Sequence, residues 1–215
     1  MKERQVKQMK IEKFVIGMVS TNCYVVSNEE SKECFIIDPG TFRPEIVSHI
    51  RNKDLKMKAI LLTHGHFDHI MGIDGFLKEF PVPVYAQEEE KILLENPQYN
   101  ASSMYEDGGY RFAGATYVKD GQILEIAGMK IRVIYTPGHT IGGCCYYLEE
   151  EAVLFSGDTL FQESIGRADL PTGSASQLVR SVREKLLVLP EDVKVYPGHE
   201  EMTTIEMERK YNPFV

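Results

Sequence analysis

The stretch THGHFDHIMG, residues 63–72, places three histidines and one aspartate within six positions. It follows the apolar run 59–62, which predicts a buried strand, and it precedes a predicted helix over residues 70–80. Alternate residues of an extended segment share a face, so His64 and His66 are expected to point the same way, while Asp68 and His69 swing round as the helix begins. Histidine nitrogens and carboxylate oxygens bind divalent metal ions at about 2.0–2.2 Å. Four such groups would crowd one ion but could serve two, and the turn therefore predicts a metal site.

Chance is the competing interpretation of this turn. In a chain of this composition, H-x-H-x-D-H arises by accident in about 2 of 10,000 cases, which makes chance a poor explanation. Three later stretches also run from an apolar strand into a tight turn that carries a ligand-type residue: 134–139 ends at His139, 153–158 at Asp158 and 193–199 at His199. Because a sheet holds its strand ends together, we expect these residues to converge on the histidine turn.

The sixth histidine, His49, lacks this context. It lies in a predicted helix four residues after Glu45, and we interpret it as a surface or packing residue.

Composition excludes several classes of protein. The net charge of −8 argues against a nucleic-acid partner, because phosphate binding needs a basic face. The charged residues 1–13 lack the apolar core of a signal peptide, and no apolar run approaches the length of a membrane span. The four cysteines show neither disulfide-dense spacing nor a C-x-x-C pair, so we expect a reducing, cytoplasmic setting.

The chain pattern predicts an α/β fold. Apolar runs bounded by turn residues predict strands over 13–16, 23–26, 34–37, 59–62, 82–85, 123–126, 131–135, 144–148, 153–155 and 193–196. Helical spacing predicts helices over 45–51, 70–80, 88–94, 174–189 and 203–210, while residues 96–116 are predicted to be irregular. Two packed sheets with helices outside, a four-layer αββα sandwich, accommodate this order.

Four motifs carry a family resemblance. T-H-x-H-x-D-H, T-P-G-H-T, S-G-D-T-L-F and Y-P-G-H-E, spread in order over residues 13–200, resemble the metallo-β-lactamase superfamily and, within it, the glyoxalase II (hydroxyacylglutathione hydrolase) branch. The resemblance implies the metallo-β-lactamase fold in one domain over residues 1–215. It also implies one metal site of His64, His66 and His139, a second of Asp68, His69 and His199, and Asp158 as a bridge. The main class of β-lactamases has cysteine where Asp158 stands, which favours the glyoxalase II branch.

The activity implied by this resemblance is hydrolysis of a small acyl thioester, such as S-lactoylglutathione, by attack of a metal-bound hydroxide on the carbonyl. The cofactors would be two divalent ions, zinc first, with iron or manganese as alternatives. Asp68 would be both a ligand and the catalytic residue that orients the nucleophile or accepts its proton. Thr63 and Thr140 flank ligands and could orient imidazoles, although strand and turn propensity explains them equally well.

The sequence departs from long glyoxalase II enzymes in its substrate loop. Where those enzymes carry Gly-Lys-x-Tyr, residues 164–171 read SIGRADLP, so Arg167 keeps a cation but Asp169 replaces the tyrosine. The chain ends at Val215 without room for their C-terminal helical domain, which is typical of shorter members. Arg167 is the candidate substrate-binding residue, yet pairing of Arg167 with Asp169 is the favoured interpretation. The tyrosines within 97–117 could roof the site or pack back on the sandwich.

Two other functions remain open. A persulfide dioxygenase, a related family with a similar G-R-x-D loop, would bind one iron through residues matching His64, His139 and Asp158. A non-catalytic binding domain would have kept the fold alone, although decayed sites tend to lose ligands. The oligomeric state is left open.

Overall fold

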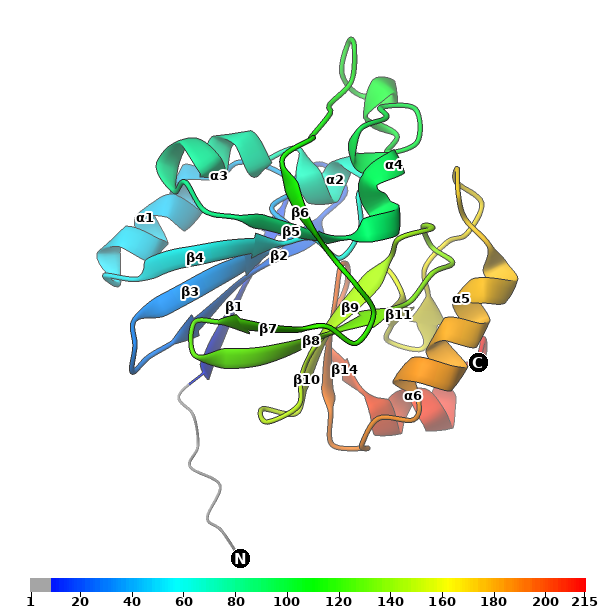
Figure 1. Ribbon diagram of the computed structural model, residues 1–215. Helices are drawn as coiled ribbons and strands as arrows, with labels where there is room; N and C mark the ends of the chain where they lie inside the picture. Colours follow the sequence, from blue (N-terminus) through cyan, green and yellow to red (C-terminus); the bar gives the residue numbers. More distant parts are fainter. Residues whose placement is uncertain (1–8) are drawn as a thin grey trace, which may run out of the picture.

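Two six-stranded sheets form the centre of the protein, in a computed structural model that describes residues 9–215 (Figure 1). In the first sheet, β1, β2 and β3 pair antiparallel, and β3 to β6 then run parallel in order along the sheet. Its strands are β1 (Met9–Ile16), β2 (Thr21–Asn28), β3 (Glu33–Ile37), β4 (Lys56–Leu61), β5 (Val84–Gln87) and β6 (Ala115–Val118). Of the charged N-terminal stretch, in which the sequence predicts no signal peptide, residues 1–8 lie outside the described part.

The second sheet has the order β14-β13-β10-β9-β8-β7. Only β10 and β13 are parallel, and the other neighbours pair antiparallel. Its strands are β7 (Ile123–Ile126), β8 (Met129–Tyr135), β9 (Cys144–Leu148), β10 (Val153–Gly157), β13 (Lys194–Pro197) and β14 (Thr203–Thr204). The short strands β11 (Leu160–Phe161) and β12 (Ser164–Ile165) form a separate hairpin.

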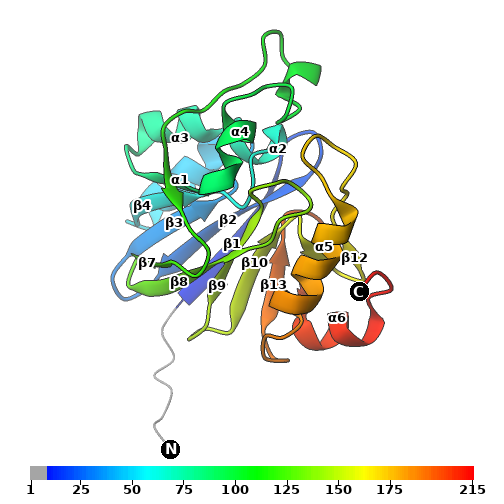
Figure 2. The same ribbon diagram turned by 45° about the vertical axis from the view of Figure 1, so that its right-hand side comes forward.

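Helices cover the outer faces of both sheets. The first sheet carries α1 (Pro44–Asn52), α2 (Phe67–Ile70), α3 (Ile73–Glu79) and α4 (Lys91–Leu94), with the 3₁₀ turns η1 (Glu88–Glu90) and η2 (Ser102–Met104). The second sheet carries α5 (Ala175–Ser181), its π-helical continuation η3 (Val182–Leu186) and α6 (Ile205–Tyr211), which come forward in Figure 2. The four-layer αββα sandwich predicted from the sequence is confirmed.

Side-chain alternation along the strands builds the layers. On β2, Tyr24 and Val26 face the cluster between the sheets, whereas Cys23 and Val25 face the helices outside. Strands β3 and β4 repeat this alternation, and because both faces are covered there, the stretches 34–37 and 59–62 are unbroken apolar runs. Burial on both sides fixes the strand ends, and therefore the turns that follow them.

Several predicted elements differ in detail. The helix expected over 70–80 is two helices, α2 and α3, because the chain turns at residues 71–72. The stretch expected to be irregular ends in β6, which extends the first sheet by one edge strand. The helix expected over 174–189 is shorter and finishes in a π-turn. Within residues 9–215, none of the helices has the length and apolar character that crossing a bilayer requires.

Candidate metal centre

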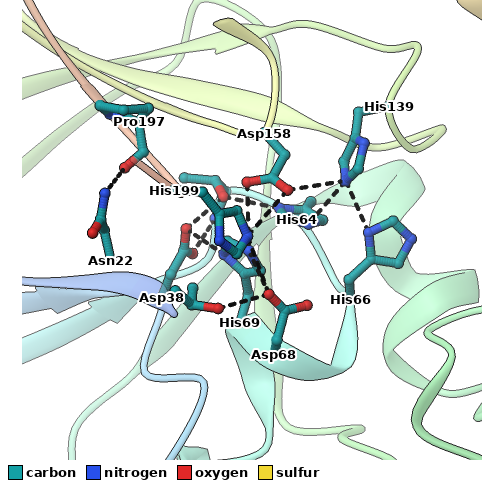
Figure 3. A network of polar contacts seen from close by, with 12 residues as sticks. Asn22, Asp38, His64, His66, Asp68, His69, His139, Asp158, Pro197 and His199 are labelled. Atoms are coloured by element: carbon teal, nitrogen blue, oxygen red, sulfur yellow. Dashed lines mark hydrogen bonds and ion pairs between the residues drawn. The ribbon is translucent and has the colours of Figure 1, made fainter. Parts of the chain in front are cut away.

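All seven residues singled out in the sequence converge at one edge of the sandwich (Figure 3). The turn after β4 and the start of α2 supply His64, His66, Asp68 and His69. The turn after β8 supplies His139, the turn after β10 supplies Asp158, and the turn after β13 supplies His199. Both sheets therefore contribute, as expected from strand ends that meet along one rim.

The first group consists of three buried histidines, His64, His66 and His139, and we call it the first cluster. One nitrogen of each lies within 4.8 Å of the other two. His139 Nε2 is 3.2 Å from His64 Nε2 and 2.9 Å from His66 Nδ1. Burial lowers the pKa of all three imidazoles, which keeps them in the neutral form that binds metal ions.

Main-chain and hydroxyl groups orient these rings. The carbonyl of Arg167 accepts a hydrogen bond from His139 Nδ1 at 2.7 Å, so the lone pair of His139 Nε2 points into the cluster. Thr63 Oγ1 lies 3.1 Å from His64 Nδ1, as one of the two interpretations of Thr63 predicts.

The second group is Asp68, His69 and His199, the second cluster. Asp68 Oδ2 lies 3.3 Å from the Nε2 atoms of both histidines. Burial disfavours the charged form of His69, but three surrounding carboxylates outweigh burial and raise its pKa well above the usual value. The pKa of Asp68 is lowered well below its usual range, because the neighbouring histidines outweigh the opposing effect of burial. The second cluster is thus a place where the protein favours positive charge.

Asp158 lies between the two clusters. Its Oδ2 is 3.6 Å from His139 Nε2 in the first cluster and 3.5 Å from His199 Nε2 in the second. Its Oδ1 is 3.5 Å from His69 Nε2. One carboxylate therefore faces both sets of donor atoms, which is the position a bridging ligand needs.

These residues fit two divalent metal ions. Among residues 9–215, the buried polar atoms without a hydrogen-bond partner include His69 Nε2 and Asp158 Oδ1, which face each other. Burying such atoms unpaired is costly, and a cation between them would remove that cost. Each cluster would hold one ion through three protein donors, with the carboxylate of Asp158 shared between the two ions.

Family comparison agrees with this geometry. The sequence model that describes the metallo-beta-lactamase superfamily matches residues 16–199 of this chain. The chain belongs to the metallo-beta-lactamase superfamily. The hydroxyacylglutathione hydrolase GloC of Haemophilus influenzae is 34% identical over 209 residues, which cover 96% of this chain and 98% of GloC.

Two solved structures are also similar to this chain. The crystal structure of BLEG-1 B3 metallo-beta-lactamase is 40% identical, with a TM-score of 0.88, and the match covers 95% of this chain and 99% of that one. The structure of TTHA1623 in a di-iron-bound form is 32% identical, with a TM-score of 0.84 and coverage of 95% and 100%. The resemblance to this superfamily that the sequence motifs indicate is confirmed.

Asp38 is a supporting residue that sequence reasoning missed. Its Oδ2 lies 3.0 Å from His69 Nδ1 and accepts a hydrogen bond from Thr63 Oγ1 at 2.6 Å. Its Oδ1 accepts from the Thr63 main-chain N–H at 2.8 Å. One buried carboxylate therefore orients ligands of both clusters. Asp38 follows strand β3 in the same strand-then-turn arrangement as the other candidates, so the sequence carries the same signal at this position.

Strand β2 supports the second cluster through two consecutive residues. Thr21 Oγ1 donates to Asp68 Oδ2 at 2.7 Å. The Asn22 side chain donates to the carbonyl of Pro197 at 3.0 Å (Figure 3). It also donates to the carbonyl of Glu200 at 2.9 Å, so it bonds the main chain on either side of His199. Position 198 must be glycine, because a Cβ there would lie 2.1 Å from Asp158 Oδ1. The turn that carries His199 is therefore held tightly against both Asp158 and β2.

A cleft of about 620 Å³ opens beside the second cluster. Its lining includes His199, Asp158, Phe161, Val15 and Lys13. The Lys13 ammonium is paired with Glu201 at 3.0 Å. This cleft is the space in which a substrate can approach the donor atoms.

Arg167 lines the same cleft, but its guanidinium is engaged with Asp169. Two hydrogen bonds of 2.7 Å join them, and the pair is exposed. The interpretation that favoured this pairing over direct recognition agrees with these contacts. The contribution of Arg167 that the sequence did not reveal is its carbonyl group, which holds His139.

The remaining candidates lie around the centre. Tyr105 is exposed and stacks on Phe67, with ring centroids 4.2 Å apart. Tyr110 and Tyr117 pack back against the outer cluster of the first sheet, as one of the two interpretations of the irregular stretch predicts. His49 contacts Glu12 and the ring of Phe14 and belongs to neither cluster, as predicted.

Proposed function

We propose that the protein is a dinuclear metal-dependent hydrolase that cleaves small acyl thioesters. The observation that carries this proposal is the pair of donor clusters joined by Asp158 and opening on a cleft. His64, His66 and His139 would hold one ion, Asp68, His69 and His199 the other, and Asp158 would touch both.

The chemistry follows from this arrangement. When bound, two divalent ions bring the pKa of water near neutrality and polarise a carbonyl group. Asp68 presents Oδ2 to Thr21 and the histidines, which leaves its other oxygen to orient the attacking water or accept its proton. The C–S bond then breaks and a thiolate leaves. A thiol has a pKa of about 8.5, so no dedicated protein acid is required.

We propose zinc as the resident metal, with iron or manganese as alternatives. Histidine and carboxylate donors suit all three ions, and availability often decides between them. The di-iron-bound form of TTHA1623, which is 32% identical to this chain, supports iron as the first of these alternatives.

S-lactoylglutathione is the substrate we propose to test first. The support is the 34% identity to GloC, which is named a hydroxyacylglutathione hydrolase. The Arg167–Asp169 pair stands where long glyoxalase II enzymes grip glutathione, so the carrier thiol of this protein need not be glutathione.

The deciding experiment combines metal analysis with two assays on one preparation. Bound metal is measured by elemental analysis, S-lactoylglutathione hydrolysis by thiol release, and oxygen uptake with glutathione persulfide. Two metals with hydrolysis support the proposal. One iron with oxygen uptake would overturn it in favour of a dioxygenase centred on His64, His139 and Asp158. No metal and no turnover would indicate a non-catalytic binding domain.

Hydrolysis of β-lactams is the second candidate function. It is favoured by the 40% identity to BLEG-1, which is described as a B3 metallo-beta-lactamase, over 95% of this chain. A chromogenic cephalosporin assayed beside the thioester tests it directly. Turnover of the cephalosporin with a higher kcat/KM than the thioester would make the lactam the better substrate.

A further inference from the structure

Glu90 is a fully buried acidic residue that neither the sequence motifs nor the proposed mechanism uses. It closes the turn η1 after strand β5 and is only 1% exposed. Burial raises the pKa of Glu90 to about 7, although the hydrogen bonds it accepts act in the opposite direction. A carboxylate this deeply buried is costly unless its oxygens are fully engaged, so its partners indicate why it is there.

Those partners belong to the two turns that carry the first cluster. Glu90 Oε1 accepts a hydrogen bond of 2.7 Å from the main-chain N–H of Gly65, the residue between His64 and His66. Glu90 Oε2 accepts from Thr140 Oγ1 at 3.0 Å, next to His139, and the main chain of Gly142 donates to the same carboxylate. A single side chain therefore joins the turn after β4 to the turn after β8.

The second turn closes tightly around this carboxylate. A Cβ on Gly142 would lie 2.5 Å from Glu90 Oε2 and 2.1 Å from the Glu90 main-chain nitrogen. Because such approaches exclude any side chain, the β8–β9 turn reaches Glu90 only with glycine at position 142. Thr140 does not donate to an imidazole, as one interpretation of the sequence predicts, but to Glu90.

We propose that Glu90 is a positioning residue that holds His64 and His66 in register with His139 and so sets the metal affinity of the first cluster. This inference rests on the proposed metal centre. The three histidines come from two turns of different sheets, and Glu90 is bonded to both turns. Glu90 contacts the turns that carry the ligands and not the ligand atoms themselves, so it would act as a support of the metal site.

Glu90→Gln is the informative variant. A carboxylate accepts hydrogen bonds on both oxygens, whereas an amide accepts on one and donates from the other. With its oxygen toward Gly65, the amide donates its NH2 to the Thr140 hydroxyl but leaves the Gly142 N–H without an acceptor. With its oxygen toward Gly142, it leaves the Gly65 N–H without one, so at almost unchanged volume one main-chain hydrogen bond is lost in either orientation. Thr140→Val removes only one donor and is the milder companion, which keeps the proposal testable if Glu90→Gln folds poorly.

Glu208 provides a matched control. It is also fully buried and accepts from a threonine hydroxyl, Thr203 Oγ1, at 2.6 Å and from a main-chain N–H, that of Glu163, at 2.9 Å. It lies on α6 and bonds neither turn of the first cluster. Glu208→Gln therefore reproduces the loss of a buried carboxylate without touching the ligand turns.

The experiment is a titration of the metal-free full chain with zinc, in which calorimetry measures the affinity of each ion. The wild type is expected to bind two ions, and Glu90→Gln to bind one of them about tenfold more weakly, the loss typical of outer supports of a metal site. Thr140→Val should weaken the same ion less, and Glu208→Gln should leave both affinities unchanged. Hydrogen exchange should show lost protection of the Gly65 or the Gly142 amide in Glu90→Gln, and of neither amide in Glu208→Gln.

The same substitution in a protein that already carries His66→Ala identifies which of the two ions is affected. In His66→Ala, where the first cluster is already broken, Glu90→Gln should cause no further loss of affinity. Unchanged zinc affinity in Glu90→Gln, an equal loss in Glu208→Gln, or a full further loss in the His66→Ala background would each overturn the inference. A wild type that binds no zinc, iron or manganese would instead refute the proposed metal centre, so the two failures are distinguishable.

Discussion

The two clusters contain similar donor atoms but lie in different electrostatic surroundings. The first cluster has three histidines, at most 4% exposed, and burial lowers the pKa of each. The second cluster contains Asp68, and the carboxylates of Asp38 and Asp158 also contact its His69. Its His199 side chain is 22% exposed and borders the cleft.

This difference assigns separate tasks to the two halves of the centre. Neutral nitrogens attract a cation weakly at a distance, so the first cluster depends on the geometry that its turns impose. The second cluster attracts a cation by charge and faces the space that a substrate would enter. We expect the first cluster to be sensitive to positioning and the second to be more tolerant of losing one donor.

Removing the residue shared by both clusters should have the largest effect. Asp158→Ala is expected to lose at least one metal ion and to lower kcat/KM by more than about 100-fold, since even outer supports of a metal site contribute 10–100-fold. Elemental analysis and the thioester assay measure the two effects. Unchanged metal content would refute the bridging assignment.

Removing one histidine from each cluster compares the two halves directly. His66→Ala leaves the first cluster with two neutral nitrogens, whereas His199→Ala leaves Asp68 and its charge in the second. After equal dialysis, His66→Ala should therefore retain less metal per chain than His199→Ala. If His66→Ala retained more metal per chain than His199→Ala, the charge of Asp68 would not be what distinguishes the two clusters.

Asp38→Asn tests the support that the clusters share. The amide keeps the shape but cannot accept from Thr63 on both oxygens while contacting His69 Nδ1. Metal affinity should fall about tenfold, as measured by competition with a chelator. An affinity equal to that of the wild type would reduce Asp38 to a packing residue.

Arg167→Ala should have a small effect. The carbonyl that holds His139 is retained, and an exposed ion pair contributes about 0–1 kcal/mol. Metal content should stay constant, and KM for the thioester should change by less than about threefold. A much larger rise in KM at constant metal content would instead make the Arg167 side chain a substrate anchor.

His49→Asn should have the smallest effect, because this histidine lies outside both clusters. It contacts Glu12 and Phe14 near the surface, so unfolding free energy should change by about 1 kcal/mol or less. Metal content and activity should equal those of the wild type. Loss of metal in this variant would show that the histidines are assigned incorrectly.

Much of the fold and the centre was predictable, because ligand-type residues directly follow apolar strands. His64, His139, Asp158 and His199 all stand at strand ends, and covering the sheets on both sides brings those ends together. The sequence therefore identifies the ligand residues that stand in turns directly after an apolar strand.

The supports were harder to predict because they act across the fold. Glu90 reaches Gly65 from 25 positions away, and nothing in the run of glutamates around Glu90 distinguishes a buried carboxylate from a solvated one. Arg167 holds His139 through its carbonyl, which every residue possesses. Such contacts depend on tertiary packing and leave no residue pattern in the sequence.

The most direct test of the central claim is a crystal structure of the metal-loaded protein with anomalous scattering measured at the metal edge. We predict two anomalous peaks on either side of Asp158, one among His64, His66 and His139 and one among Asp68, His69 and His199. A single peak, or a second peak outside the second cluster, would contradict a dinuclear centre.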